Sequence, residues 1–371
     1  MAIRVGLIGI SATRGWGALA HLPALRALPD YEIAAVANRH QEAADAAAAH
    51  FGVPLAFGDP RRLVECEGID LVVVTARVME HDRLVRMAIE AGKHIYCEWP
   101  LGVDVAEAEA LAELARRAGI RTVIGLQGYQ SAGVHAVRGL LQRGAIGRPT
   151  AISVIGSGGP HGPITPQAYR YTLDKASGAT ILTVSAAHWL AAVEPMMGPI
   201  ARVSATALTV LDETVIAETG ERVPVNAPDQ LAITGELASG ALMSLAIHSG
   251  VVPSAQGFRA WIVGTQGTLT IEPAGPGSFQ MADWKLSLHR ADGRVETIIP
   301  DDDLPAAIPA GPARNVARTY RALAPALLDP ACGTADLATF DTALRFHRLI
   351  ATIDRAAKSG RAVAIGAGSF R

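Results

Sequence analysis

The chain has 371 residues, of which 50% are hydrophobic and 18% charged, with a formal net charge of -2. That length suits two domains, each able to bury its own core. The near-neutral charge and dispersed basic residues exclude a nucleic-acid or anionic-membrane partner. No apolar stretch reaches membrane-spanning length and the strand-like start lacks a signal-peptide pattern, so we expect a cytoplasmic protein.

The three cysteines, Cys66, Cys97 and Cys332, are single and widely spaced. This spacing predicts buried free thiols and neither a disulfide framework nor a C-x-x-C metal site. No other grouping of His, Cys, Asp and Glu has ligand spacing. We therefore expect no metal.

Residues 4–10 form an apolar run typical of a parallel strand covered on both faces, and residues 18–28 read as a helix. The turn between them is rich in small residues, so its backbone can approach a ligand, and the helix start attracts an anion. The G-x-G-x-x-G pattern is irregular, because Ser11 and a turn lengthened through Arg14 to Gly15 follow Gly9. An ordinary strand-helix turn stays equally open. The predicted cofactor contacts in this turn are Gly9, Ser11, Ala12, Thr13, Arg14 and Trp16.

Strand and helix patterns alternate over residues 1–126, which predicts an α/β Rossmann-type domain with a parallel sheet. Asp104 is placed to cap a helix over 105–118. The predicted strands are 4–10, 31–37, 70–75, 94–98 and 121–126, and further predicted helices are 41–50 and 80–91.

Residues 127–371 have a different pattern, with a helix over 131–143 and then successive short strands separated by turns. This predicts an α+β domain built on a large, open, mostly antiparallel sheet. The last helices, 314–328 and 335–358, belong to this domain, and the C-terminal helix packing back on the first domain stays open as an alternative. A broad open sheet face favours a homodimer or higher homo-oligomer. The predicted strands are 151–156, 201–208, 230–237, 241–248, 259–263, 268–272, 286–289 and 295–299.

Asn38 and Arg39 follow the second strand, where dinucleotide folds contact the adenosine ribose. An acidic residue there accepts from a free 2′-hydroxyl, whereas an arginine pairs with a 2′-phosphate. Because the acid is missing and Arg39 is present, NADP is favoured and NAD stays open. The alternative is an exposed loop arginine without a binding role.

Thr75, Val78 and His81 follow the third of the predicted strands, at the edge where ligands of open parallel sheets bind. The next strand lies in A-G-K-H-I-Y-C-E-W-P-L at 91–101, which resembles the A-G-K-H-V-x-x-E-K-P-L segment of the Gfo/Idh/MocA oxidoreductases. His21-Leu22-Pro23-Ala24-Leu25 and the late His188 extend the resemblance over most of residues 1–360.

Within that family the chain is similar to a divergent branch that includes the co-repressor of the fungal galactose regulon. The shared features are the turn from Gly9 to Trp16, the Glu98-Trp99 pair and Leu126-Gln127-Gly128. The resemblance implies a nicotinamide dinucleotide, with Glu98, Trp99 and Gln127 at its nicotinamide end. The fungal relative is a sensor and no catalyst, so fold alone does not decide the role.

Two family groups are replaced, since Trp99 stands at the lysine of E-K-P and Val184 at the aspartate of D-x-x-x-H. His188 is retained as a proton carrier. Among four lysines, only Lys175 is placed to substitute for the missing one. The alternatives are a histidine satisfied within the fold and a solvated loop lysine. Candidate substrate contacts, with loop packing as the alternative, are Tyr169, Tyr171 and His161.

The sequence therefore predicts an NADP-preferring oxidoreductase that exchanges a hydride with a secondary alcohol of a sugar, polyol or related metabolite. The competing hypothesis is a non-catalytic NAD(P)-binding regulator or metabolite sensor. Trp99 and Val184 favour the sensor, whereas His188 favours the enzyme.

Overall fold

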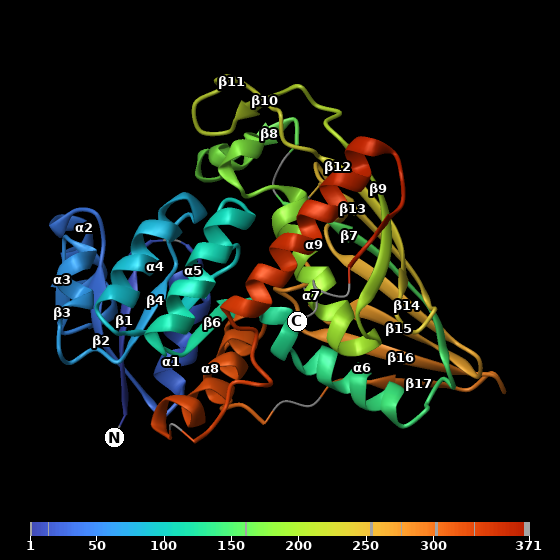
Figure 1. Ribbon diagram of the computed structural model, residues 1–371, viewed down its shortest axis with the longest axis horizontal. Helices are drawn as coiled ribbons and strands as arrows, with labels where there is room; N and C mark the ends of the chain where they lie inside the picture. Colours follow the sequence, from blue (N-terminus) through green and yellow to red (C-terminus); the bar gives the residue numbers. More distant parts are fainter. Residues whose placement is uncertain are drawn as a thin grey trace. The chain divides into compact units, whose positions relative to one another are not determined.

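The computed structural model describes residues 2–13, 15–159, 162–252, 255–275, 277–300, 303–329 and 331–366. The chain forms two compact units, Met1–Gln130 with Asp303–Leu344 and Ser131–Asp302 with Arg345–Arg371. Figure 1 shows the elements of both. The sequence assigned all of 127–371 to one domain, whereas residues 303–344 belong to the first unit.

The first unit contains a six-stranded parallel sheet in the order β3-β2-β1-β4-β5-β6. The strand order reverses between β1 and β4, and ligands of such sheets bind beyond the carboxyl ends at this point. The predicted Rossmann domain is confirmed, although the short β3 was missed. The strands are β1 Ile3–Ile8, β2 Tyr31–Ala37, β3 Leu55–Phe57, β4 Leu71–Val74, β5 His94–Glu98 and β6 Thr122–Gly125.

Helices lie on this sheet where the sequence expected them. The Asp104 side chain accepts a hydrogen bond from Glu107 N at 2.9 Å, which caps α5 as predicted, and Gly119 ends that helix with a positive φ of 66°. The helices of the unit are η1 Gly17–His21, α1 Leu22–Ala27, α2 Gln41–Phe51, α3 Pro60–Val64, η2 Val78–Glu80, α4 His81–Glu90, α5 Val105–Ala118, η3 Gln127–Gln130 and α8 Pro312–Leu328.

Helix α8 explains why a late segment belongs to the first unit. Its apolar face buries Val316, Tyr320 and Leu323 in the same core as Leu22 and Leu25 of α1. An amphipathic helix gains its stability by burying that face, and here the first unit supplies the partner. Residues from the far end of the chain thereby reach the neighbourhood of η1.

The second unit contains a nine-stranded sheet in the order β17-β16-β15-β14-β7-β13-β12-β9-β18. Among the described strands of this sheet only the β7–β13 pairing is parallel, so the predicted large, mostly antiparallel sheet is confirmed. The strands are β7 Pro149–Ser157, β9 Ile200–Leu208, β12 Gln230–Leu237, β13 Leu242–His248, β14 Phe258–Gly264, β15 Gly267–Pro273, β16 Trp284–Arg290, β17 Val295–Ile298 and β18 Val363–Ala364.

A second, three-stranded sheet was missed because its strands are only two to four residues long. It consists of β8 Ile164–Thr165, β10 Glu213–Ile216 and β11 Arg222–Pro224 in the order β11-β10-β8. The other helices of the unit are α6 Ala132–Gln142, η4 Gln167–Leu173, η5 Lys175–Ser177, η6 Ile181–Ala186, α7 Ala187–Met197 and most of α9 Phe340–Ser359.

Aromatic side chains hold α7 on one face of the large sheet. Trp189 stacks on Phe279 with ring centroids 3.8 Å apart and lies 6.4 Å from Trp284 of β16. The opposite face presents Ile155, Leu242 and Val263, which are 50%, 58% and 41% exposed. No helix in the described ranges is both long and apolar enough to cross a bilayer.

Candidate functional site

Two glycines set the geometry of the turn after β1. Gly9 has a φ of 92°, and a Cβ there would lie 3.0 Å from Ala76 N, so only glycine fits. A Cβ on Gly17 would collide with the Ile10 side chain and lie 3.0 Å from Thr75 Oγ1. Gly17 thus allows the close approach of helix to strand that the third glycine of the Rossmann pattern provides. Sequence reasoning missed it because the lengthened turn displaces it from the usual spacing.

Polar side chains fix the backbone of this turn. Asn38 Nδ2 donates to Ile10 O at 2.8 Å, and Thr75 Oγ1 donates to Ile8 O at 3.0 Å. Thr13 N donates to Ser11 Oγ at 3.3 Å. Ala12 lies beside them in the turn, half-buried, whereas Arg14 falls outside the described residues. The turn is therefore shaped by contacts within the first unit.

Trp16 and Arg39 flank this turn differently. The Trp16 ring packs against the apolar core of the unit, and its buried Nε1 has no hydrogen-bond partner among the described residues. Arg39, after β2, is exposed. A free guanidinium at this strand end fits the 2′-phosphate of NADP. The turn, the buried N–H group and this cation together fit a dinucleotide.

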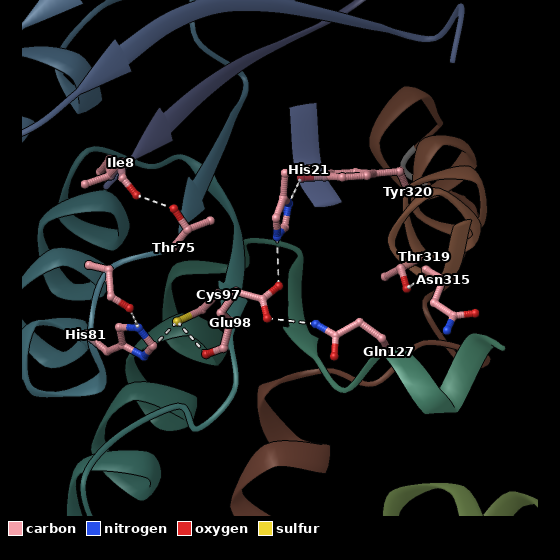
Figure 2. A network of polar contacts seen from close by, with 11 residues as sticks. Ile8, His21, Thr75, His81, Cys97, Glu98, Gln127, Asn315, Thr319 and Tyr320 are labelled. Atoms are coloured by element: carbon pink, nitrogen blue, oxygen red, sulfur yellow. Dashed lines mark hydrogen bonds and ion pairs between the residues drawn. The ribbon is translucent and has the colours of Figure 1, made fainter. Parts of the chain in front are cut away.

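Glu98, at the end of β5, lies at the centre of a polar network (Figure 2). His21 Nε2 is 2.8 Å from its Oε1, and Gln127 Nε2 donates to its Oε2 at 2.7 Å. A Cβ on Gly125, its neighbour in β6, would lie 2.6 Å from the carboxyl carbon. Each carboxylate oxygen therefore has a donor, and the glycine leaves the space that the group occupies.

The ring nitrogens of His81 face two backbone carbonyls and one thiol. Its Nδ1 lies 2.8 Å from Pro100 O and its Nε2 lies 2.9 Å from Ala76 O, while Cys97 Sγ is 3.4 Å from Nδ1. Burial lowers the pKa of His81, against the opposing effect of its two carbonyl contacts. Both ring nitrogens face the chain's own carbonyls, so this histidine braces the ends of β4 and β5.

Val78 and Trp99 complete the wall at this edge. Both are buried, at 4% and 7% exposure, on the segments that follow β4 and β5. Neither side chain can exchange a proton at neutral pH. Valine has no polar group, and the indole N–H of tryptophan donates hydrogen bonds without ionising. Their contribution is shape and apolar surface.

In the second unit, His188 lies in the first turn of α7 and is 5% exposed. Its Nδ1 is buried, and no hydrogen bond to it occurs within the described part of the chain. Burial lowers the pKa of His188 to about 4. The side chain is thus a neutral imidazole at physiological pH, able to accept a proton. Val184, one helical turn earlier in η6, offers it no carboxylate.

Lys175 lies in η5 with an exposed side chain. Its backbone N donates to Asn226 Oδ1 at 2.7 Å, and Asn226 Nδ2 donates to Asp174 Oδ1 at 3.1 Å, which fixes the turn that carries it. None of the contacts described in this unit joins Lys175 to His188. Tyr169 is 44% exposed on η4.

The structure gives few contacts for the remaining candidate substrate residues. Tyr171 is half-buried on η4, and His161 lies outside the described residues. No group of three or more His, Cys, Asp and Glu side chains in the described ranges could hold a metal ion.

Comparison with known proteins matches the two units to different families. Residues 3–126 match the oxidoreductase family with an NAD-binding Rossmann fold, and residues 133–273 match the C-terminal domain of Gal80p. The chain is 29% identical to the dehydrogenase aclE of Aspergillus oryzae over 73% of this chain and 76% of that protein.

The chain is also similar to a regulator. It is 26% identical to the galactose/lactose metabolism regulatory protein GAL80 of Saccharomyces cerevisiae, over 73% of this chain and 66% of that protein. The crystal structure of a super-repressor mutant of Gal80p from the same yeast has the same fold, with a TM-score of 0.88, 22% identity and full coverage of both chains. The chain is therefore similar to the NAD-binding Rossmann-fold oxidoreductases over residues 3–126 and to the C-terminal domain of Gal80p over residues 133–273.

Proposed function

We propose that the protein is an NADP-preferring cytoplasmic oxidoreductase that exchanges a hydride with a secondary alcohol of a sugar, polyol or related metabolite. The observation that supports catalysis is His188, a buried neutral imidazole whose Nδ1 is unpaired within the described ranges. A hydroxyl that loses a hydride becomes strongly acidic and needs a base within hydrogen-bond reach. His188 is that base.

The first unit holds the cofactor in this proposal. The turn at Gly9 leaves room for the pyrophosphate, Arg39 pairs with the 2′-phosphate, and Glu98 with Gln127 orients the nicotinamide end. When bound, the nicotinamide supplies the hydride chemistry. Trp99 forms an apolar wall there and excludes water.

The second unit supplies the substrate contacts. His188 takes the hydroxyl proton, and Lys175 stabilises the developing alkoxide with its charge. Tyr169, Tyr171 and His161 contact the substrate's other polar groups. Similarity to a dehydrogenase over 73% of the chain supports a catalytic function.

The test is a screen of sugars and polyols for NADPH formation, run beside titration of the protein with NADP and NAD. We expect tighter binding of NADP and turnover with at least one compound. Because the pKa of His188 is about 4, kcat/KM should stay level down to about pH 5. A chelator should change neither binding nor turnover. An acid limb near pH 6.5 would contradict the role of His188.

A second function, a non-catalytic NAD(P)-binding regulator, is favoured by other observations. Trp99 carries no charge, Val184 carries no carboxylate, and an imidazole with a pKa of about 4 is a weak base. The chain is similar to the regulatory protein GAL80, and residues 133–273 match the C-terminal domain of Gal80p. Dinucleotide binding without turnover on the whole panel would favour this function over the first.

We also infer that a second copy of the chain covers the open face of the large sheet. Ile155, Leu242 and Val263 alternate with buried residues on β7, β13 and β14, so they share that face. Sedimentation should show a dimer or larger oligomer that Ile155→Glu dissociates. Leu55→Glu, an equivalent change at a 37% exposed site on β3, should leave the assembly intact.

A further inference from the structure

A buried chain of polar groups runs from α8 to the end of β5. Tyr320 Oη lies 2.7 Å from His21 Nδ1, and His21 Nε2 lies 2.8 Å from Glu98 Oε1. Tyr320 and His21 are both 0% exposed, whereas the Glu98 side chain retains 14% exposure. Figure 2 shows His21 between Tyr320 and Glu98. The accessible end of this chain is therefore the carboxylate.

We propose that Tyr320 and His21 are positioning residues that hold the Glu98 carboxylate in the orientation needed at the nicotinamide end of the cofactor. The inference rests on the proposed function, because that function places the nicotinamide at Glu98. Neither Tyr320 nor His21 touches the cofactor in this proposal; both act through Glu98.

The direction of the two hydrogen bonds of His21 follows from the groups at its two ends, the Tyr320 hydroxyl and the Glu98 carboxylate. Burial raises the pKa of Tyr320 well above its usual value, and the nearby Tyr96, Tyr31 and Glu98 add to the effect. The hydroxyl therefore stays protonated. The Glu98 carboxylate only accepts hydrogen bonds, so the His21 Nε2 that faces it carries a proton, and in this tautomer Nδ1 accepts from the Tyr320 hydroxyl.

Without the Tyr320 hydroxyl, the His21 ring would lose one of the two hydrogen bonds that fix its orientation towards Glu98. The surrounding rings leave little room for another arrangement, since Tyr96 packs edge-on against His21 with centroids 5.0 Å apart and stacks on Tyr320 at 5.1 Å. The carboxylate thus selects the tautomer, and the Tyr320 hydroxyl holds the ring that bonds the carboxylate.

The test compares NADP with adenosine 2′,5′-bisphosphate, which lacks the nicotinamide end, by titration of the full-length protein. Tyr320→Phe should weaken NADP by about 3- to 10-fold, as expected for one neutral hydrogen bond, and leave the bisphosphate unchanged. NAD and AMP form the parallel pair. Equal weakening of a dinucleotide and its adenosine half would show a merely structural role and overturn the proposal.

Tyr31→Phe is the matched control. Its hydroxyl donates to Tyr320 O at 2.6 Å, so it is a buried tyrosine of the same cluster that lies outside the chain to Glu98. It should lower the thermal midpoint without separating NADP from the bisphosphate. A selective loss of NADP binding in Tyr31→Phe would overturn the proposal.

A double-mutant comparison with Glu98→Gln keeps the proposal testable if Tyr320→Phe folds poorly. Glu98→Gln keeps the shape of the side chain, and the Gln127 Oε1, which has no partner among the described residues, can accept from the new amide. In that background Tyr320→Phe should add less than twofold to the loss of NADP binding, because both act on one group. Full additivity would overturn the inference. Native protein that binds neither dinucleotide would overturn the proposed function itself.

Discussion

The principal titratable groups of the two units, Glu98 and His188, differ in their hydrogen-bond partners. In the first unit, Glu98 has a donor on each oxygen, and one of those donors, His21, is itself held by Tyr320. In the second unit, the buried Nδ1 of His188 has no hydrogen-bond partner among the described residues, and burial alone lowers the pKa of the side chain. A saturated network fixes one geometry, whereas an unpaired buried nitrogen retains its capacity for a ligand. The first unit thus suits a constant cofactor and the second a substrate.

The largest effect should come from removing the unpaired group. If the protein is an enzyme, His188→Ala should lower turnover by about 10²- to 10⁴-fold, the usual contribution of a general base. Cofactor affinity should hardly change, because the residue lies outside the first unit. Full turnover of this variant on a confirmed substrate would direct attention to Tyr169 or Tyr171.

Arg39 is the exposed cation that follows β2, and it sharpens the comparison from the cofactor side. Arg39→Ala should weaken NADP by about tenfold to a hundredfold, as expected for a charged hydrogen bond, and leave NAD nearly unchanged. Isothermal titration with both dinucleotides measures this difference. Equal affinity of the native protein for NADP and NAD would remove Arg39 from the site.

The contrast should also appear in stability. Between about pH 6.5 and pH 4 the unfolded chain binds a proton at His188 that the folded chain excludes, so the unfolding free energy falls as the pH decreases. From pH 7 to pH 5 this group should account for about 2 kcal/mol in urea unfolding. His188→Gln should lose correspondingly less over the same interval. Identical losses would show that His188 titrates normally.

Lys175 should give the smallest effect. Its side chain is exposed and solvent screens its charge, so Lys175→Ala should lower turnover by about tenfold, below the loss typical of a buried oxyanion donor. Lys285→Ala, at a 44% exposed side chain on β16, serves as the control and should leave kcat unchanged. A loss as large as that of His188→Ala would make Lys175 the principal group.

The periodicity of apolar residues along the sequence was sufficient to predict most strands and helices of both units. Apolar runs such as 71–74 and the capped helix after Asp104 depend on neighbours in sequence, so strand and helix periods identify them. The strands β3 and β8 are too short to carry a period. Gly17 was missed because only the packing against Ile10 and Thr75 shows what it does.

The site was predictable only where one segment carries it. Glu98 and Gln127 follow from motif resemblance, but their relation to Tyr320 depends on contacts between distant segments. His81 also illustrates the limit, because its place after β4 predicts a cofactor contact but does not show that its ring nitrogens face Pro100 O and Ala76 O. Strand ends indicate where a side chain lies and leave its partners undetermined.

The position of α8 has a consequence for how the protein is made. His21 and Tyr320 are 299 positions apart, and the first unit needs residues 303–344 to be complete. At a synthesis rate of about 5–20 residues per second, a nascent chain carries all the Rossmann strands for roughly 10–40 seconds before Tyr320 is added. During that interval the nascent chain contains His21 and Glu98 but lacks Tyr320, the hydrogen-bond partner of His21. The ribosome therefore adds every strand of the nine-stranded sheet except β18 before the nicotinamide end of the first unit can take its final form.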